Sequence, residues 1–152
     1  MLKIIFTKKK TSEKLYSRSI DLISSQISSI PELRKLTIKI QRDFTKLNSN
    51  ASKLLIAEGR DMGTVIFPKA EIKIFLWAKA EIRAQRRYLQ VKKVRKINKF
   101  IDILKEIETR DMRDMTRKIA PLRPAEDSYL IDNSNLDIEQ SFNRILKIIK
   151  KN

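Results

Sequence analysis

Residues 53–78, "KLLIAEGRDMGTVIFPKAEIKIFLWA", decide how this chain folds, because two apolar runs flank a charged turn. "KLLIA" (53–57) and "IKIFLWA" (72–78) are short, apolar and bounded by loops, which is typical of buried strands. Both glycines of the 152-residue chain, Gly59 and Gly63, lie between the two runs. Glycine permits a positive φ or the close approach of backbone to a ligand. The stretch therefore predicts a buried strand followed directly by a ligand-binding turn.

Outward from this stretch, apolar residues recur at helical spacing on both sides. Pro31 is suited to the first turn of a helix, and Asp137 with Gln140 predicts a capping box at the start of the last helix. "SYLID" (128–132) predicts a third buried strand. The predicted helices cover residues 12–29, 31–48, 80–95, 97–109, 110–118 and 138–149. Apolar strands that alternate with helices predict an α/β fold, with three strands of a parallel sheet flanked by helices.

Length and composition set limits on the class of protein. A chain of 152 residues fits a single domain. No apolar run approaches the roughly 18 residues that a membrane-spanning helix needs, and the N-terminus does not read as a secretory signal. The chain has no cysteine and no histidine, which excludes disulfides, thiolate zinc sites and imidazole bases. We expect a cytoplasmic protein without a membrane partner.

The chain carries 34 Lys and Arg against 18 Asp and Glu, a formal charge of +16. Such a charge attracts polyanions, including nucleic acid and phosphorylated small molecules. A solvated, lysine-rich surface explains many of the lysines equally well. The arginines are more informative, because their planar guanidinium groups suit two-point contacts with phosphate.

The charged turn at 58–61 follows the first predicted strand, and ligands of parallel α/β sheets bind beyond the carboxyl ends of strands. An acidic side chain such as Glu58 can hold a hydrated Mg²⁺, and Arg60 can hold a phosphate. The alternative is an ordinary turn with solvated charges.

A second charged group lies in "RDMRDMTR" (110–117). Arg110, Asp114 and Arg117 share one helix face, where two arginines and an aspartate could clamp a phosphate. Met112 and Met115 fall on the opposite side, where we expect a core stripe. The alternative is a solvated helix face stabilised by pairs of opposite charge. Weaker signals are Arg83 and Arg87, one turn apart in "AEIRAQRRYLQ" (80–90), and Ser25 and Arg34, which flank a helix junction.

Four segments together resemble bacterial cytidylate (CMP) kinases, in their order and their spacing. The resemblance extends from about Phe6 to about Lys147, and the second and fourth segments are its most specific parts. The segments are "SSQISSIPELR" (24–34), "EGRDMGTVIFPKAEIKIFL" (58–76), "AEIRAQRRYLQ" (80–90) and "ETRDMRDMTRKIAPLRPAEDSYLIDNSNLDIEQ" (108–140).

The resemblance implies a P-loop nucleoside monophosphate kinase, which moves the γ-phosphoryl group of ATP, with Mg²⁺, onto CMP or dCMP. It implies that Ser25, Arg34 and Asp61 contact the cytosine end of the acceptor, with Asp114 at the nucleoside. Arg60, Arg110 and Arg117 would hold the acceptor phosphate and the transferring group. Arg83 and Arg87 would belong to a lid helix over ATP, and Glu58 would lie near the magnesium shell. Because phosphoryl transfer depends on positioning and electrostatics, a chain without histidine or cysteine can support it.

The family's glycine-rich loop, G-x-x-x-x-G-K-[ST], cradles the ATP phosphates, and a chain with glycine only at 59 and 63 does not contain it. We expect 1–152 to be one incomplete domain. Residues 1–48 would be the remainder of the monophosphate-binding insertion and its following helix. Residues 49–152 would be the core strands, the lid helix and the C-terminal helices. Alone, the chain should then be inactive, and a separate N-terminal fragment with the P-loop is an expected partner.

Two alternatives come from other classes. The +16 charge would suit a basic nucleic-acid-binding protein, although no reader motif or set of stacking aromatic residues supports that reading, and nucleic acid is not the expected partner. The other is a non-functional remnant of a truncated gene. The sequence leaves open whether CMP, dCMP or UMP is preferred.

Overall fold

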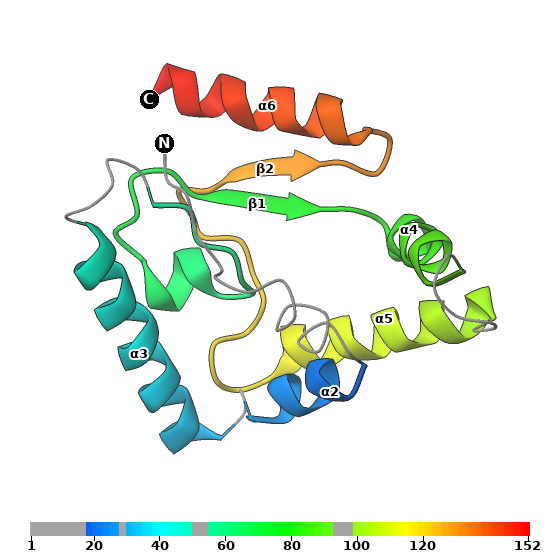
Figure 1. The fold of residues 1–152 in the computed structure, drawn as a ribbon, viewed down its shortest axis with the longest axis horizontal. Helices are drawn as coiled ribbons and strands as arrows, with labels where there is room; N and C mark the ends of the chain where they lie inside the picture. The colour runs from blue at the N-terminus through cyan, green and yellow to red at the C-terminus, as the bar shows by residue number, and fades with distance from the viewer. Residues whose placement is uncertain (1–17, 28–29, 50–54, 93–98) are drawn as a thin grey trace.

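The computed structural model describes residues 18–27, 30–49, 55–92 and 99–152. Within them the chain forms six helices or helical turns and two strands, shown in Figure 1. In chain order these are α2 (Arg18–Ile27), α3 (Pro31–Ser49), the π-helical turn η1 (Met62–Ile66), β1 (Ile74–Trp77), α4 (Ala80–Lys92), α5 (Phe100–Thr116), β2 (Tyr129–Asp132) and α6 (Ile138–Lys151).

The sheet consists of β1 and β2, which pair in parallel with Ile74 opposite Tyr129 and Trp77 opposite Asp132. Figure 1 shows α6 beside β2, and α4 just beyond the carboxyl end of β1. The parallel α/β architecture agrees with the predicted class. Of the three predicted strands, those at 72–78 and 128–132 are present as β1 and β2, and the one at 53–57 is not confirmed. Residues 55–57 of "KLLIA" form neither helix nor strand, and residues 53–54 lie outside the described part of the chain.

A strand exists only where its backbone groups find a ladder partner. The described residues offer one ladder, between β1 and β2, and residues 55–57 do not join it. The predicted burial of this run is also wrong for its described residues, since Leu55 and Ile56 are 37% and 57% exposed. An apolar run bounded by loops cannot say whether a neighbouring strand is available to pair with it or cover it.

The helices follow the predicted ranges closely. Pro31 opens α3, and Asp137 and Gln140 form the predicted capping box at the start of α6, with the Gln140 N–H 2.7 Å from Asp137 Oδ1. The two helices predicted over 97–118 are one continuous helix, α5, which packs against α4. Residues 12–17, 28–29 and 93–98 of the predicted helices lie outside the described residues.

The buried face of α5 differs from the prediction. Met112 and Met115 are 65% and 60% exposed, so the predicted methionine core stripe is wrong. The buried residues of α5 are Ile103 and Asp114, which lie three turns apart on one face. The inward stripe of α5 therefore changes from apolar to charged along its length. Asp114 is tolerated there because arginines surround it, as buried charges require.

The described buried apolar residues form a small core of Ile66, Ala78, Ala84, Ile103, Ala120 and Ile131. Several larger apolar side chains stay exposed around the sheet, among them Leu130 at 63% and Ile138 at 90%. Among the helices that the structure describes, none has the length and apolar character needed to cross a membrane.

Candidate functional site

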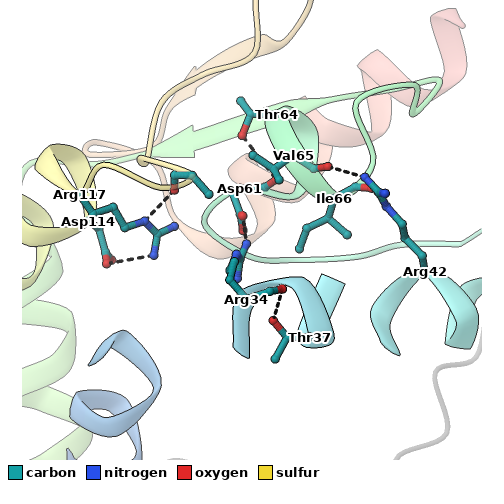
Figure 2. A network of polar contacts seen from close by, with 10 residues as sticks. Arg34, Thr37, Arg42, Asp61, Thr64, Val65, Ile66, Asp114 and Arg117 are labelled. Carbon is teal, nitrogen blue, oxygen red and sulfur yellow. Dashed lines mark hydrogen bonds and ion pairs between the residues drawn. The ribbon is translucent and has the colours of Figure 1, made fainter. Parts of the chain in front are cut away.

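The segment between the predicted strands folds around η1, and its geometry places Asp61. The N–H groups of Val65 and Ile66 both donate to the Asp61 carbonyl, at 2.9 and 3.2 Å. From α3, Arg42 donates through Nε to the Ile66 carbonyl at 2.9 Å and through Nη2 to the Val65 carbonyl at 2.8 Å. Arg42 therefore fastens η1 to α3, as Figure 2 shows. Single π-helical turns are frequent at functional sites.

The two glycines do not use one of the two freedoms that the sequence suggested, because neither has a positive φ. A Cβ at Gly59 would come within 2.5 Å of the terminal methyl of the flexible Met62 side chain, and one at Gly63 would lie 3.4 Å from the side chain of Lys73. The close approach of this backbone to a ligand stays a prediction. The segment turns through the wide hydrogen-bonded loop of η1.

Arg34, on α3, forms an ion pair with Asp61 across the gap between α3 and η1 (Figure 2). Both residues are buried. Burial, with a smaller contribution from the nearby charge of Arg117, lowers the pKa of Arg34 below its ordinary value. Arg34 and Asp61, two residues that the resemblance assigns to the same end of the acceptor, thus pair in a water-poor environment, where charge pairing is strong.

Asp114 is the second buried carboxylate, 2% exposed near the end of α5. Arg60 Nε lies 3.4 Å and Arg110 Nε 4.0 Å from its Oδ2. Arg117 Nη1 lies 3.8 Å from its Oδ1. The structure therefore brings Arg60, from the motif at 58–61, together with Arg110, Asp114 and Arg117, from the motif at 110–117.

We name Arg34, Arg60, Asp61, Arg110, Asp114 and Arg117 the arginine–aspartate cluster. Its four arginines and two aspartates leave two positive charges. Arg60 and Arg117 approach Asp114 at distances longer than a good hydrogen bond, so Asp114 orients them without using all their N–H groups. Within the described part of the chain, the buried atoms Arg34 Nε and Arg117 Nη2 have no hydrogen-bond partner. Buried donors are normally satisfied, so such a cluster suits an anion with several oxygens.

Other predicted site residues lie outside this cluster. Ser25 lies on α2, but its side chain is outside the described set. Glu58 is exposed, and the described residues contain no group of three acidic side chains that could hold a metal ion. Mg²⁺ commonly uses one or two carboxylates together with substrate phosphates. Glu58 alone fits one such contact, not a protein-built metal site.

The predicted lid arginines behave differently from each other. Arg83 donates through Nε to the Ala78 carbonyl at 2.8 Å and pairs through Nη2 with Asp111 at 2.6 Å. It therefore links α4 to α5 and to the end of β1. Arg87, one turn further along α4, is exposed.

Sequence reasoning did not predict the contacts of three cations that donate to backbone carbonyls of η1 and of loops. The first is Arg42. The second is Arg86, which donates to the carbonyls of Asn133 and Leu136 at 2.7 and 3.0 Å. The third, Lys73, donates to the Pro68 carbonyl at 2.5 Å and pairs with Asp127 at 2.6 Å. A lysine inside the apolar run "IKIFLWA" was an available signal, because a buried charge needs partners. Nothing in the sequence distinguishes Arg42 or Arg86 from surface arginines.

Comparison of the sequence with known proteins identifies its family. The sequence model of the family described as "Cytidylate kinase" matches residues 2–151. A cytidylate kinase of Caldicellulosiruptor saccharolyticus is 43% identical over 140 residues, which cover 92% of this chain and 60% of that protein. One from Pasteurella multocida is 40% identical over 150 residues, 99% of this chain and 64% of that protein. The chain thus spans less than two thirds of the length of these relatives. The match over nearly all of its residues shows that the chain belongs to the cytidylate kinase family.

Proposed function

We propose that the arginine–aspartate cluster binds the acceptor nucleotide of a kinase that transfers the γ-phosphoryl group of ATP to CMP or dCMP. The observation that carries this proposal is the surplus of two positive charges beside buried guanidinium donors that lack partners. A nucleoside monophosphate carries nearly two negative charges on its phosphate, with three oxygens that accept hydrogen bonds. The relatives described above are named cytidylate kinases, which supports the same substrate class.

In this proposal the arginines do most of the chemical work. Arg60, Arg110 and Arg117 hold the acceptor phosphate and neutralise the charge that spreads over the transferring group. Asp114 keeps the three guanidinium groups in one place before the nucleotide arrives, and it lies at the nucleoside. Such preorganisation lowers the barrier because the protein does not have to reorient its charges during the reaction.

The Arg34–Asp61 pair supports a preference for cytosine. Cytosine presents an amino donor beside ring acceptors, so a carboxylate beside a guanidinium complements its edge. Uracil presents a carbonyl where cytosine has the amino group, and a carboxylate would repel it. We therefore propose that Arg34 and Asp61, with Ser25, read the base and favour CMP or dCMP over UMP.

The ATP side is also a proposal. Arg83 and Arg87 would belong to the lid helix α4. The exposed Arg87 would be directed to ATP, whereas Arg83 would stay in its ion pair with Asp111. Mg²⁺ would bridge the ATP phosphates, with Glu58 near its water shell. The phosphate-binding loop G-x-x-x-x-G-K-[ST] does not occur among these 152 residues. We propose that polypeptide outside them supplies it, for which a separate N-terminal fragment is one source, and that the 152 residues alone do not turn over.

Nucleotide binding tests the acceptor site directly. In titration calorimetry of the 152-residue chain, we expect CMP to bind more tightly than UMP, and Arg60→Ala to weaken CMP binding by about tenfold or more. Arg123→Ala is the matched control, because Arg123 is an exposed arginine outside the cluster. If Arg60→Ala and Arg123→Ala weaken CMP binding equally, the cluster is not the acceptor site. If the chain binds nucleic acid with an affinity that falls steeply with added salt and does not change when CMP is present, the nucleic-acid alternative is favoured instead.

A complementation assay tests the ATP side. We expect no CDP from the 152-residue chain with CMP, ATP and Mg²⁺, and measurable CDP after addition of a P-loop fragment from a relative. Arg117→Ala in the 152-residue chain should abolish the restored activity. Turnover by the 152 residues alone would contradict this part of the proposal.

A further inference from the structure

The turn that follows α5 contains an unusual backbone conformation at Ala120. Ala120 has a φ of 50°, and it is the non-glycine residue with positive φ among the described residues. A side chain with a Cβ is unfavourable in this region. The next residue is Pro121, and a residue before proline is also restricted to extended conformations. Two local preferences therefore oppose the conformation of Ala120.

Such a conformation persists only where its surroundings hold it, and it is frequent at functional sites. Ala120 is 8% exposed, so its methyl group is packed in the interior. The Leu122 N–H donates to the Asp114 carbonyl at 2.7 Å and returns the chain to α5. The turn is thus fixed at both of its ends.

The turn acts on Arg117. The Ala120 carbonyl accepts a hydrogen bond from Arg117 Nε at 2.6 Å, and Nη1 of the same guanidinium faces Asp114 Oδ1 at 3.8 Å. Two sides of the planar group are therefore held. The remaining nitrogen, Nη2, is buried without a hydrogen-bond partner within the described residues. Figure 2 shows the guanidinium directed from α5 toward the Arg34–Asp61 pair.

We propose that Ala120 is a positioning residue, whose left-handed turn aims its carbonyl at Arg117 Nε and so directs Arg117 Nη2 at the acceptor phosphate. Alanine and proline restrict this turn more than glycine would. The inference rests on the proposed function in one respect, namely that the anion at Arg117 is the phosphate of the acceptor nucleotide.

Variants that differ in their tolerance of positive φ test the proposal. Ala120→Gly and Ala120→Asn keep the turn, and we expect their CMP affinity to stay within about threefold of the wild type. Ala120→Val is incompatible with the turn because of its branched side chain, and we expect it to weaken CMP binding by about tenfold or more. Ala125→Val is the matched control, since Ala125 has no positive φ and its carbonyl accepts hydrogen bonds from Ser128, whereas Arg117 Nε donates to Ala120.

A second readout separates positioning from a general loss of structure. Cytidine lacks the phosphate, so Ala120→Val should leave cytidine affinity unchanged while CMP affinity falls. In Arg117→Ala, adding Ala120→Val should weaken CMP binding no further, because the two residues act through one group. Equal losses for CMP and cytidine, or additive losses in the double variant, would overturn the positioning role.

Two further outcomes keep this inference separate from the proposed function. If Arg117→Ala leaves CMP affinity unchanged, the acceptor-site proposal fails. If Arg117→Ala weakens binding but Ala120→Val does not, the positioning role alone fails. If Ala120→Val does not fold, the rate at which the Arg117 Nε–H exchanges with solvent in the wild-type chain tests the hydrogen bond to the Ala120 carbonyl. We expect it to be slower than that of the exposed Arg123, and equal exchange would overturn the inference.

Discussion

The arginine–aspartate cluster differs from the sheet layer, by which we mean β1, β2 and α6. The cluster buries charged side chains, whereas the sheet layer exposes apolar ones, and proteins usually do the opposite. In the cluster, Asp61 and Asp114 are buried. In the sheet layer, Phe142 and Ile138 of α6 and Leu130 of β2 are exposed. The cluster buries charges because each has a partner of opposite sign within the described chain. The sheet layer leaves apolar groups open because its two strands and one helix cover only part of their own surface. Charge pairing, more than apolar burial, therefore organises the site.

The most severe test of this contrast is the removal of a buried charge from the cluster. Asp114→Ala leaves three arginines without their shared carboxylate, and we expect the free energy of unfolding to fall by about 3–5 kcal/mol. Urea unfolding followed by circular dichroism measures it. Asp111→Ala is the control on the same helix, because Asp111 is more exposed and has one arginine partner, so its loss should be below about 1 kcal/mol. Equal losses in the two variants would show that the cluster does not stabilise the fold.

The next largest effect is expected from the apolar core beside the cluster. Ile66 is 1% exposed at the end of η1, so Ile66→Ala should reduce the free energy of unfolding by about 3 kcal/mol. Leu130→Ala removes a side chain of the same size from the sheet layer, where it is mostly exposed, and should cost much less. The same urea experiment compares the two. A larger loss for Leu130→Ala would mean that the sheet layer is covered in solution.

A smaller effect tests how much the N-terminal cap of α6 contributes to stability. Asp137 accepts a hydrogen bond from the Gln140 N–H, so Asp137→Ala should cost about 1 kcal/mol through loss of the helix cap. Ile138→Ser, at the next position, should change the free energy of unfolding by less than about 0.5 kcal/mol, because Ile138 is already in water. If the Ile138 variant costs more than the Asp137 variant, the exposed face of α6 has a partner.

The smallest expected effect is the pH dependence of the Lys73–Asp127 pair. The hydrogen bond from Lys73 lowers the pKa of Asp127. A carboxyl whose pKa is lower in the folded state stabilises the fold above its unfolded pKa, about 3.9, and that contribution disappears as the pH falls through the folded value. The wild type should therefore lose more stability than Asp127→Asn as the pH falls below about 4. Parallel stability curves for the two proteins would contradict this.

Local patterns predicted the helices well. Pro31, the Asp137–Gln140 box and helical spacing act within one or two turns, so they can be recognised without knowledge of the rest of the fold. The predicted methionine stripe on α5 was wrong because burial, unlike helix formation, depends on distant parts of the chain. Periodicity shows that Met112 and Asp114 lie on different faces, but the face that turns inward depends on what packs against it.

The candidate site was predicted in part. The resemblance named Arg34, Arg60, Asp61, Arg110, Asp114 and Arg117, and the structure brings all six together. Their individual roles stay predictions. The cations that hold the surrounding loops were not found, because Arg42 and Arg86 bind backbone carbonyls, and a carbonyl leaves no mark in a sequence.

By itself, the sequence determined the residue types of the site, the order of the helices and the presence of apolar runs at β1 and β2, because composition and local spacing act along the chain. Which of the apolar runs pair was decided by the tertiary structure. Only the tertiary structure decided that α5 turns its aspartate inward, that the glycine-bearing segment bends through η1, and that Ala120 takes a left-handed conformation beside Arg117. Each of these depends on contacts between residues distant in the chain, or on strain that only packing can hold. Sequence periodicity describes the faces of an element, whereas its neighbours decide which face is buried.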